Sequence, residues 1–347
     1  MKTLILKIDK KNPERKKILL AANIIRKGGL VAFPTETVYG LGADALNPKA
    51  VKKIYEVKRR PFDNPLIVHI ARKKDLFRLA RSVPKEVKIL IRNFWPGPLT
   101  LILKASKIVP KVTTAGLDTI AIRMPNHKVA LDLIKACGKP IAAPSANLSG
   151  RPSPTLAQHV IQDLYGKIDL ILDAGPTDIG VESTVLDLSS PTPQILRPGG
   201  ITFEKLKKVL KDLVVHPVAI GKKTTILAKS PGLKHKHYAP KAKMIVVEGK
   251  NRIKKIKELA MKNIYEGKKI GILAISKQLN TLKKNCIVKF FGKNKSLKLV
   301  AKNLFKLLRE LDEEKVDLII AEGVEDTGLG LAIMNRLRKA AGYKIIN

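Results

Sequence analysis

The sequence predicts an α/β protein with an N-terminal domain on a twisted mixed sheet and a smaller C-terminal domain on a parallel, Rossmann-like sheet. Helix-like and strand-like segments alternate along the 347 residues, and short turns join several strands of the first part. A regular strand–helix alternation then starts afresh after the middle of the chain. This length is sufficient for two hydrophobic cores, so we expect domains at 1–215 and 243–347 with a linker at 216–242.

Short apolar runs bounded by turn-forming residues predict the strands of the first domain. These strands are expected at 1–8, 30–33, 66–70, 99–103, 119–123, 140–143, 169–173, 183–188 and 194–197. The first of them alternates like an edge strand. The strand at 30–33 runs into a polar turn and a Gly-Leu-Gly.

Capping residues and proline delimit the helices. Asn47 caps a helix whose first position is Pro48, where the missing N–H of proline costs nothing, and Pro61 prevents its continuation. Gly138 ends another helix. The predicted helices of the first domain lie at 49–59, 129–136, 156–165 and 203–213, with two helical stretches between 70 and 94.

The periodicity fails over the linker, which contains Ser230-Pro231-Gly232 and the segment His235 to Pro240. Connections of this length inside a compact protein are usually functional or true linkers. Beyond it, strands are expected at 244–247, 270–274 and 318–321, and helices at 252–265 and from about 330. This βα alternation is typical of a parallel sheet.

The net charge of +38 comes from 67 lysines and arginines against 29 acidic residues. Such a field attracts nucleic acids, nucleotides and other polyanions. The positive charge is mostly lysine, is spread through the helices, and is not interleaved with aromatic residues. A solvated lysine-rich exterior, as in proteins from hot environments, is therefore favoured over a dedicated nucleic-acid surface.

The two cysteines, Cys137 and Cys286, are far apart and belong to no CxxC or histidine cluster. We therefore expect neither a disulfide nor a metal site. No run of eighteen apolar residues and no signal peptide is present, so we expect a cytoplasmic protein.

The motifs of P-loop kinases, α/β-hydrolases and HExxH metalloenzymes are absent, and each Gly-Leu-Gly is only half of a dinucleotide fingerprint. Polar residues instead follow or end five predicted strands. Because ligands bind beyond the carboxyl ends of strands in open α/β sheets, we expect these residues to converge there. They are Thr35 and Thr37, His69, Arg123, Ser145 and Asn147, and Arg197.

Each of these residues also has a purely structural interpretation. The cations Lys58, Arg59 and Arg60 end a helix, where positive charge offsets the helix dipole. His69 is compatible with a structural histidine, and Ser145 with a turn former. Arg123 and Arg197, at the ends of apolar strands, favour a carboxylate or phosphate ligand. No single residue decides between the two interpretations.

Several separate motifs together resemble the YrdC-like threonylcarbamoyl-AMP synthases. They are Pro34-Thr-Glu-Thr-Val-Tyr-Gly-Leu-Gly42, Lys58-Arg-Arg60 with Asn64-Pro-Leu66, Pro144-Ser-Ala-Asn-Leu-Ser-Gly150, Ser183-Thr-Val185 and Arg197-Pro-Gly199. The linker and the second α/β domain resemble the long, two-domain form of that family. The resemblance covers nearly the whole chain and contains the motifs in the same order.

The resemblance implies an L-threonylcarbamoyladenylate synthase, a nucleotidyltransferase that makes threonylcarbamoyl-AMP and pyrophosphate from ATP, L-threonine and bicarbonate for tRNA modification at adenosine 37. It implies Mg²⁺ bound with ATP, and product transfer to a downstream tRNA threonylcarbamoyl transferase. A weak tRNA contact is also expected. No protein nucleophile is needed, which agrees with the missing nucleophile motifs, because positioning and cationic stabilisation supply the catalysis.

The same resemblance assigns residues. The implied threonine pocket comprises Thr37, His69, Arg123, Ala143 and Ser183, with Arg123 on the amino-acid carboxylate. The implied ATP site comprises Arg60, Asn64, Thr119, Ser145, Asn147, Ser153, Arg197 and Tyr238, the last as a lid. Lys58 and Arg60 are the implied catalytic cations near the phosphates.

Two other classes of function are alternatives to this one. An RNA-binding protein would use the basic sheet without ATP turnover and would lose affinity steeply with salt. A carbamoyl-transfer maturation factor would need cysteine-rich and further catalytic domains, and two cysteines do not fit that class. The role of the C-terminal domain stays open between dimerisation, lid control and docking of the transferase.

Overall fold

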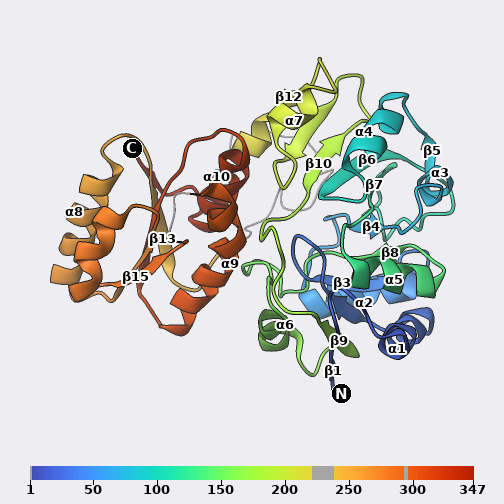
Figure 1. The fold of residues 1–347 in the computed structure, drawn as a ribbon, viewed down its shortest axis with the longest axis horizontal. Coiled ribbons are helices and arrows are strands. Elements are labelled where there is room, and N and C mark those ends of the chain that lie inside the picture. The colour runs from blue at the N-terminus through green and yellow to red at the C-terminus, as the bar shows by residue number, and fades with distance from the viewer. Residues whose placement is uncertain (1, 221–237, 293–295) are drawn as a thin grey trace. The chain divides into compact units, whose positions relative to one another are not determined.

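The computed structural model describes residues 2–220, 238–292 and 296–347 (Figure 1). The motifs Ser230-Pro231-Gly232 and His235 to His237 lie outside these residues. The chain forms two units: Met1–Ser149 with Ser153–Lys234, and Gly150–Pro152 with His235–Asn347. The short segment Gly150–Pro152 belongs to the second unit because hydrogen bonds attach it there. Arg309 donates to the Pro152 carbonyl, and the Ala239 N–H donates to the Gly150 carbonyl.

The first unit contains a mixed sheet of twelve strands among its described residues, which confirms the predicted fold class. Eleven strands follow one another across the sheet, and β5 (Ala80–Ser82) pairs with β6 beside this path. In spatial order they are β1 (Leu4–Lys7), β9 (Leu170–Asp173), β2 (Val31–Phe33), β3 (Gly40–Asp44), β8 (Ile141–Ala142), β4 (Ile67–His69), β7 (Thr119–Arg123), β6 (Leu99–Ala105), β10 (Thr184–Asp187), β11 (Gln194–Arg197) and β12 (Val214–Val215).

The helices of this unit begin and end largely where local signals place them. The Asn47 side chain accepts from the Lys49 and Ala50 N–H groups and starts α2 at Pro48, and Gly138 ends α5 with a φ of 69°. The described helices are α1 (Arg15–Arg26), α2 (Pro48–Lys58), α3 (Asp75–Leu79), α4 (Glu86–Phe94), α5 (Lys128–Cys137), α6 (Ala157–Leu164), α7 (Phe203–Lys207) and the 3-10 turn η1 (Pro217–Ile220).

The structure differs from the expectation in one strand that was not assigned and in one helix that is shorter. The Gly-Leu-Gly that was expected after a turn is part of strand β3, antiparallel to β2. The helix expected over 203–213 ends at Lys207, and Val214–Val215 pairs with β11 instead. Lysines crowd the end of that segment and repel one another at helical spacing, whereas two β-branched valines suit an edge strand.

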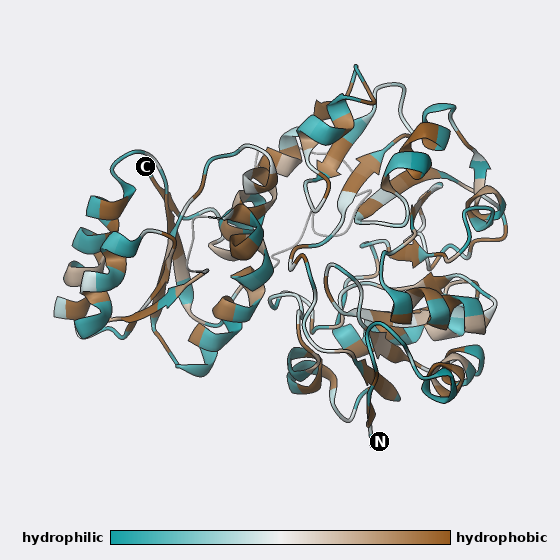
Figure 2. Ribbon diagram, in the orientation of Figure 1, coloured by the Kyte–Doolittle hydropathy of each residue, from teal (hydrophilic) through white to brown (hydrophobic). Residues whose placement is uncertain are grey.

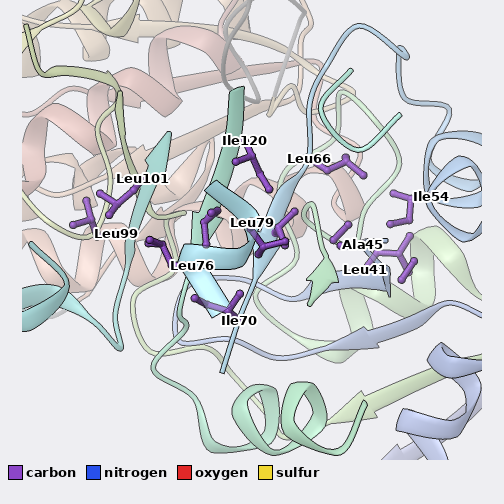
Figure 3. Close-up of a cluster of buried hydrophobic side chains, with 14 of the residues drawn as sticks. Leu41, Ala45, Ile54, Leu66, Ile70, Leu76, Leu79, Leu99, Leu101 and Ile120 are labelled. Atoms are coloured by element: carbon purple, nitrogen blue, oxygen red, sulfur yellow. The ribbon is translucent and has the colours of Figure 1, made fainter. Parts of the chain in front are cut away.

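Alternation along the strands gives the first unit two cores, one on each face of the sheet. Val31 and Phe33 of β2 pack with α1 and α5, while Ala32 between them faces the larger core. Figure 3 shows part of this larger core, where Leu41, Leu66, Leu101 and other apolar side chains meet. Figure 2 shows the corresponding hydrophobic colour on the strands and hydrophilic colour on the outer sides of helices.

The second unit is an all-parallel, five-stranded sheet between helices, which confirms the Rossmann-like prediction. Helix α8 covers one face, and α9 and α10 pack together on the other (Figure 1). Its elements are β13 (Lys243–Val247), α8 (Arg252–Tyr265), β14 (Ile270–Ala274), the 3-10 helix η2 (Lys277–Lys284), β15 (Ile287–Phe290), α9 (Leu297–Glu313), β16 (Leu318–Glu322), α10 (Leu329–Ala340) and β17 (Ile345–Ile346).

None of the helices in the described part of the chain is both long enough and apolar enough to span a membrane.

Replacing Leu101 by alanine should test the larger core. Leu101 is fully buried in β6, so Leu101→Ala should lower the free energy of unfolding by roughly 2–5 kcal/mol through lost burial and a residual cavity. Urea denaturation measures this change. Leu20→Ala on exposed α1 surface is the control and should change stability by less than about 0.5 kcal/mol; equal losses in both variants would contradict the assigned core.

Candidate active site

Five neighbouring strands of the first unit carry a row of residues that lie directly opposite one another. His69 of β4 pairs with Arg123 of β7, and Arg123 pairs with Thr100 of β6. Thr100 pairs with Val185 of β10, and Val185 with Arg197 of β11. Opposite residues point to the same face of a sheet, so this cross-strand row displays a histidine, a threonine and two arginines together.

The polar row continues an apolar patch on the same face. Ile67, Ala121 and Ile102 lie two residues along the same strands from His69, Arg123 and Thr100. Because side chains alternate with a period of two, the patch and the row share one face. The apolar patch therefore forms a low-dielectric boundary beside the buried polar groups.

Arg197 reaches this face through an irregularity in the β10–β11 pairing. Val185 is opposite Arg197, yet the next residue, Leu186, is opposite Ile195, so Leu196 is an extra residue. Such a bulge turns the following side chain relative to the regular alternation. Without the bulge Arg197 would share the face of Ile195, which packs in the larger core.

The predicted convergence at the carboxyl ends of strands is found for His69, Arg123 and Arg197, which end β4, β7 and β11, but not for Ser145 after β8. β8 runs antiparallel to β4, so the end of β8 that leads to Ser145 and the end of β4 that carries His69 lie at opposite edges. Cross-strand register brings the residues at the ends of β4, β7 and β11 together.

Hydrogen bonds tie the middle of the row to the loop before β10. The Ser183 and Thr100 hydroxyls are 2.8 Å apart, and Arg197 Nη2 donates to Ser183 Oγ at 3.1 Å. Arg197 Nε and Nη2 also donate to the Ser183 carbonyl, at 3.2 and 3.0 Å. Ser183, Thr100 and Arg197 are all buried and thus form one fixed group.

His69 is a buried neutral imidazole. Burial lowers its pKa from the ordinary 6.5 to about 3, and the Arg123 guanidinium adds to the effect. Its Nδ1 has no hydrogen-bond partner among the residues that the structure describes, and its ring lies edge-on to Phe33 at 6.3 Å between centroids. The imidazole therefore offers an unused polar atom to a ligand.

Arg123 is paired with Glu36 of the loop between β2 and β3. Its Nη2 is 2.6 Å from Glu36 Oε2, and the exposed fractions of the two side chains are only 4% and 6%. Arg123 Nε donates to the Gly97 carbonyl at 3.4 Å. Arg123 was predicted as a site residue and Glu36 was not, although Glu36 is the one charged residue between Lys27 and Asp44.

The β2–β3 loop is fixed by its threonines. Thr35 Oγ1 donates to the Val38 carbonyl and lies 2.9 Å from Thr37 Oγ1, so the Thr37 hydroxyl is buried within the turn. Gly42 allows β3 to approach β2, because a Cβ there would lie 2.7 Å from the Phe33 ring. The Gly-Leu-Gly therefore serves close strand packing.

Lys58 at the end of α2 holds the loop that follows β8. Its ammonium group donates to the carbonyls of Ser145 and Asn147, and the Ser149 N–H returns a bond to the Lys58 carbonyl. Burial lowers the pKa of Lys58 well below its ordinary value; Arg60 lowers it further and Asp163 opposes them. The structure thus brings the second and third motifs together.

The remaining predicted residues of the first unit are also buried. Arg60 Nε donates to the Asn64 carbonyl at 3.0 Å and its Nη2 to the Pro65 carbonyl at 2.9 Å. Ser153 Oγ donates to Glu182 Oε1 at 2.7 Å. Thr119 is four residues before Arg123 in strand β7 and therefore faces the same side of the sheet. The Ala143 N–H donates to the Ile67 carbonyl.

Tyr238 lies in the second unit, where its ring stacks on Phe305 with 5.1 Å between centroids. The Arg336 guanidinium lies 5.6 Å from the same ring centroid. The φ of Tyr238 is 65°, which is unusual for a residue other than glycine. Its predicted role as a lid stays a prediction.

The described residues contain no group of three or more histidines, cysteines or acidic residues placed to hold a metal ion. Cys137 and Cys286 are free thiols in the structure. The buried groups of the first unit instead suit an anionic or zwitterionic ligand, because arginines and hydroxyls are donors that match carboxylate and phosphate oxygens.

Two family models match this chain. The model described as "Telomere recombination", for Sua5, YciO and YrdC, matches residues 23–199, and the model described as "Threonylcarbamoyl-AMP synthase, C-terminal domain" matches residues 201–342. The first model covers most of the mixed-sheet unit with its buried cationic row, and the second covers most of the parallel-sheet unit. The two units together therefore define a two-domain α/β protein of this family class. The chain belongs to the Sua5–YciO–YrdC family, in its long form, as the sequence motifs predicted.

Individual relatives agree over the full length. The chain is 53% identical to the threonylcarbamoyl-AMP synthase of Pyrococcus abyssi (strain GE5 / Orsay), covering 96% of each chain. It is 50% identical to that of Bacillus subtilis (strain 168), covering 95% of this chain and 94% of the relative. The crystal structure of P. abyssi Sua5 complexed with L-threonine superposes with a TM-score of 0.94, at 52% identity and 99% coverage of both chains.

Lys58→Met should destabilise the fold more than an exposed lysine does. The change leaves two carbonyls inside the protein without their donor, so the free energy of unfolding should fall by roughly 2–5 kcal/mol. Lys52→Met on the exposed side of the same helix is the control. Similar urea midpoints for the two variants would show that the ammonium group is not structural.

The low pKa of His69 should make stability depend on pH. Between pH 6.5 and 3 the unfolded chain binds a proton that folded His69 does not, so stability is full above pH 6.5 and falls as pH decreases. From pH 7 to 5 this histidine should account for a loss of about 2 kcal/mol. Between pH 7 and 5, the free energy of unfolding of His69→Gln, measured with urea, should fall by about 2 kcal/mol less than that of the wild type. An equal fall in both proteins would show that His69 is not a buried neutral histidine.

Proposed function

We propose that this protein is a threonylcarbamoyl-AMP synthase that condenses L-threonine, bicarbonate and ATP. The amine of threonine and bicarbonate form a carbamate with release of water. A carbamate oxygen then attacks the α-phosphate of ATP, and pyrophosphate leaves. The enzyme would accordingly be a nucleotidyltransferase, and its product would supply the threonylcarbamoyl group for adenosine 37 of tRNA.

The cross-strand row is the observation that carries this proposal. It places Arg123 and Arg197, both buried, on one face with the Thr100 and Ser183 hydroxyls between them. A guanidinium in such a site favours a carboxylate or a phosphate, and two of them on one face suit a reaction that joins an amino acid to a nucleotide. The threonine named in the P. abyssi structure supports the amino-acid half.

For threonine we propose a pocket of Thr37, His69, Arg123, Ala143 and Ser183, with Arg123 on the carboxylate. For ATP we propose Arg60, Asn64, Thr119, Ser145, Asn147, Ser153 and Arg197, with Tyr238 as a lid. Asn64 Oδ1 has no hydrogen-bond partner in the described part of the chain and is available to a ligand. Lys58 would act by fixing the Ser145–Asn147 loop beside the phosphates.

MgATP is the proposed form of the nucleotide. The absence of an acidic cluster among the described residues is compatible with Mg²⁺ held chiefly by phosphates and water. We further propose that residues 1–215 carry the reaction, and that the product passes to a tRNA threonylcarbamoyl transferase. The net charge of +38 supports a weak, salt-sensitive contact with tRNA.

Pyrophosphate release should require ATP, threonine and bicarbonate together. Arg123→Ala should raise the KM for threonine by roughly 10- to 100-fold, because a charge-assisted hydrogen bond to the carboxylate is lost, and should change the KM for ATP by less than about threefold.

A coupled pyrophosphate assay measures both constants. Arg78→Ala, an exposed arginine of α3, is the matched control and should leave both unchanged. Full pyrophosphate release without threonine would refute the reaction, whereas equal effects of Arg123→Ala on both substrates would refute only the pocket.

A further inference from the structure

The backbone around Glu36 is held firmly. The Glu36 carbonyl accepts from the Asp178 and Ile179 N–H groups at 3.2 and 2.9 Å, and the Thr37 carbonyl accepts from the Gly180 N–H at 3.2 Å. Thr35 Oγ1 accepts from the Thr37 and Val38 N–H groups, both at 3.2 Å. The Glu36 carboxylate therefore extends into the site from a fixed turn, and only its side-chain torsions can move it.

The ion pair that this carboxylate makes is incomplete. Glu36 Oε2 contacts Arg123 Nη2, but neither Glu36 oxygen receives a well-directed hydrogen bond from any described residue. An ionised carboxylate has about four acceptor positions. A buried ion pair compensates the cost of desolvation only when further hydrogen bonds satisfy both groups. The Glu36–Arg123 pair is thus poorly satisfied and suits replacement by a ligand with its own charges.

We propose that Glu36 receives the α-ammonium group of the amino-acid substrate, and that the substrate carboxylate replaces the Glu36 carboxylate on Arg123. This rests on the proposed function, in which Arg123 binds that carboxylate. An amino acid carries a carboxylate and an ammonium group on one carbon, which complements a guanidinium and a carboxylate in contact. Binding exchanges one poorly directed pair for two sets of charge-assisted hydrogen bonds.

This arrangement makes Glu36 a determinant of specificity. A ligand with the same carboxylate but no ammonium group must separate Glu36 from Arg123 and leave a buried carboxylate without a cation, which is costly. Sites that pair with a charged substrate group reject analogues lacking it far more strongly than apolar pockets reject a missing methylene. The site therefore selects zwitterions over hydroxy acids.

Calorimetric titration of Glu36→Gln can test this role in the full-length protein. The probes are L-threonine and its analogue 2,3-dihydroxybutanoate, in which a hydroxyl replaces the ammonium group. Wild type should bind threonine at least about 30-fold more tightly than the analogue. In Glu36→Gln, threonine should bind at least roughly tenfold more weakly, whereas the analogue should bind about threefold more tightly because Arg123 is released.

Opposite changes for the two ligands distinguish recognition from a structural role. Equal weakening of both ligands, or no change in either, would overturn the inference while threonine binding by wild type keeps the proposed function intact. Failure of wild type to bind threonine would instead remove the proposed function and this inference with it.

Two further variants serve as a control and as an alternative to Glu36→Gln. Asp178→Asn removes an exposed carboxylate near Glu36, whose carbonyl accepts from the Asp178 N–H. The Asp178 side chain pairs only with surface Lys10 among the described ion pairs, so the change should alter both affinities by less than about twofold. If Glu36→Gln does not fold, Glu36→Asp retains the charge on a shorter side chain. It should weaken threonine yet keep the preference over the hydroxy acid, and loss of that preference would contradict the role.

Discussion

Buried positive charge is the constraint on which the first unit depends. Lys58, Arg60, Arg123 and Arg197 are all removed from water, and a buried cation without partners costs several kcal/mol. The partners come from the segments that carry the family resemblance: Ser145 and Asn147, Asn64 and Pro65, Glu36, and Ser183. Two of these cations, Lys58 and Arg197, bond to acceptors from a different motif, which ties those motifs together.

Much of the fold could be predicted because its signals are local. The bounds of α2 follow from its capping residue and proline, those of α8 from apolar periodicity, and those of β7 and β14 from short apolar runs. β3 could not be predicted, because glycine has low strand propensity and its presence there depends on close approach to Phe33. The shortened α7 depended on a pairing between β11 and β12 that the helix-like sequence does not reveal.

The candidate site could also be predicted only in part from the sequence. Residue types and motif order indicated Arg123, Arg197 and Ser183, but their meeting depends on strand register and on one extra residue at Leu196, which are tertiary properties. Glu36 lies within the Pro34–Gly42 motif, but its role could not be predicted because its partner is on a strand 87 residues away in sequence (roughly a quarter of the chain). The sequence signal that could have indicated Glu36 is that it is a single acidic residue in an otherwise uncharged, buried segment.

The pairing of β1 with β9 has a consequence for biosynthesis. Thr3 donates its hydroxyl proton to the Ile168 carbonyl, 165 residues further along, and Leu4–Lys7 lies against Leu170–Asp173. At about 5–20 residues per second, the first strand leaves the ribosome roughly 10 to 30 seconds before its partner exists. During that interval Leu4, Ile5 and Leu6 are an unpaired apolar edge flanked by Lys2 and Lys7, and flanking lysines oppose aggregation of such edges. The order of synthesis therefore keeps β1 out of the sheet until β9 has been made.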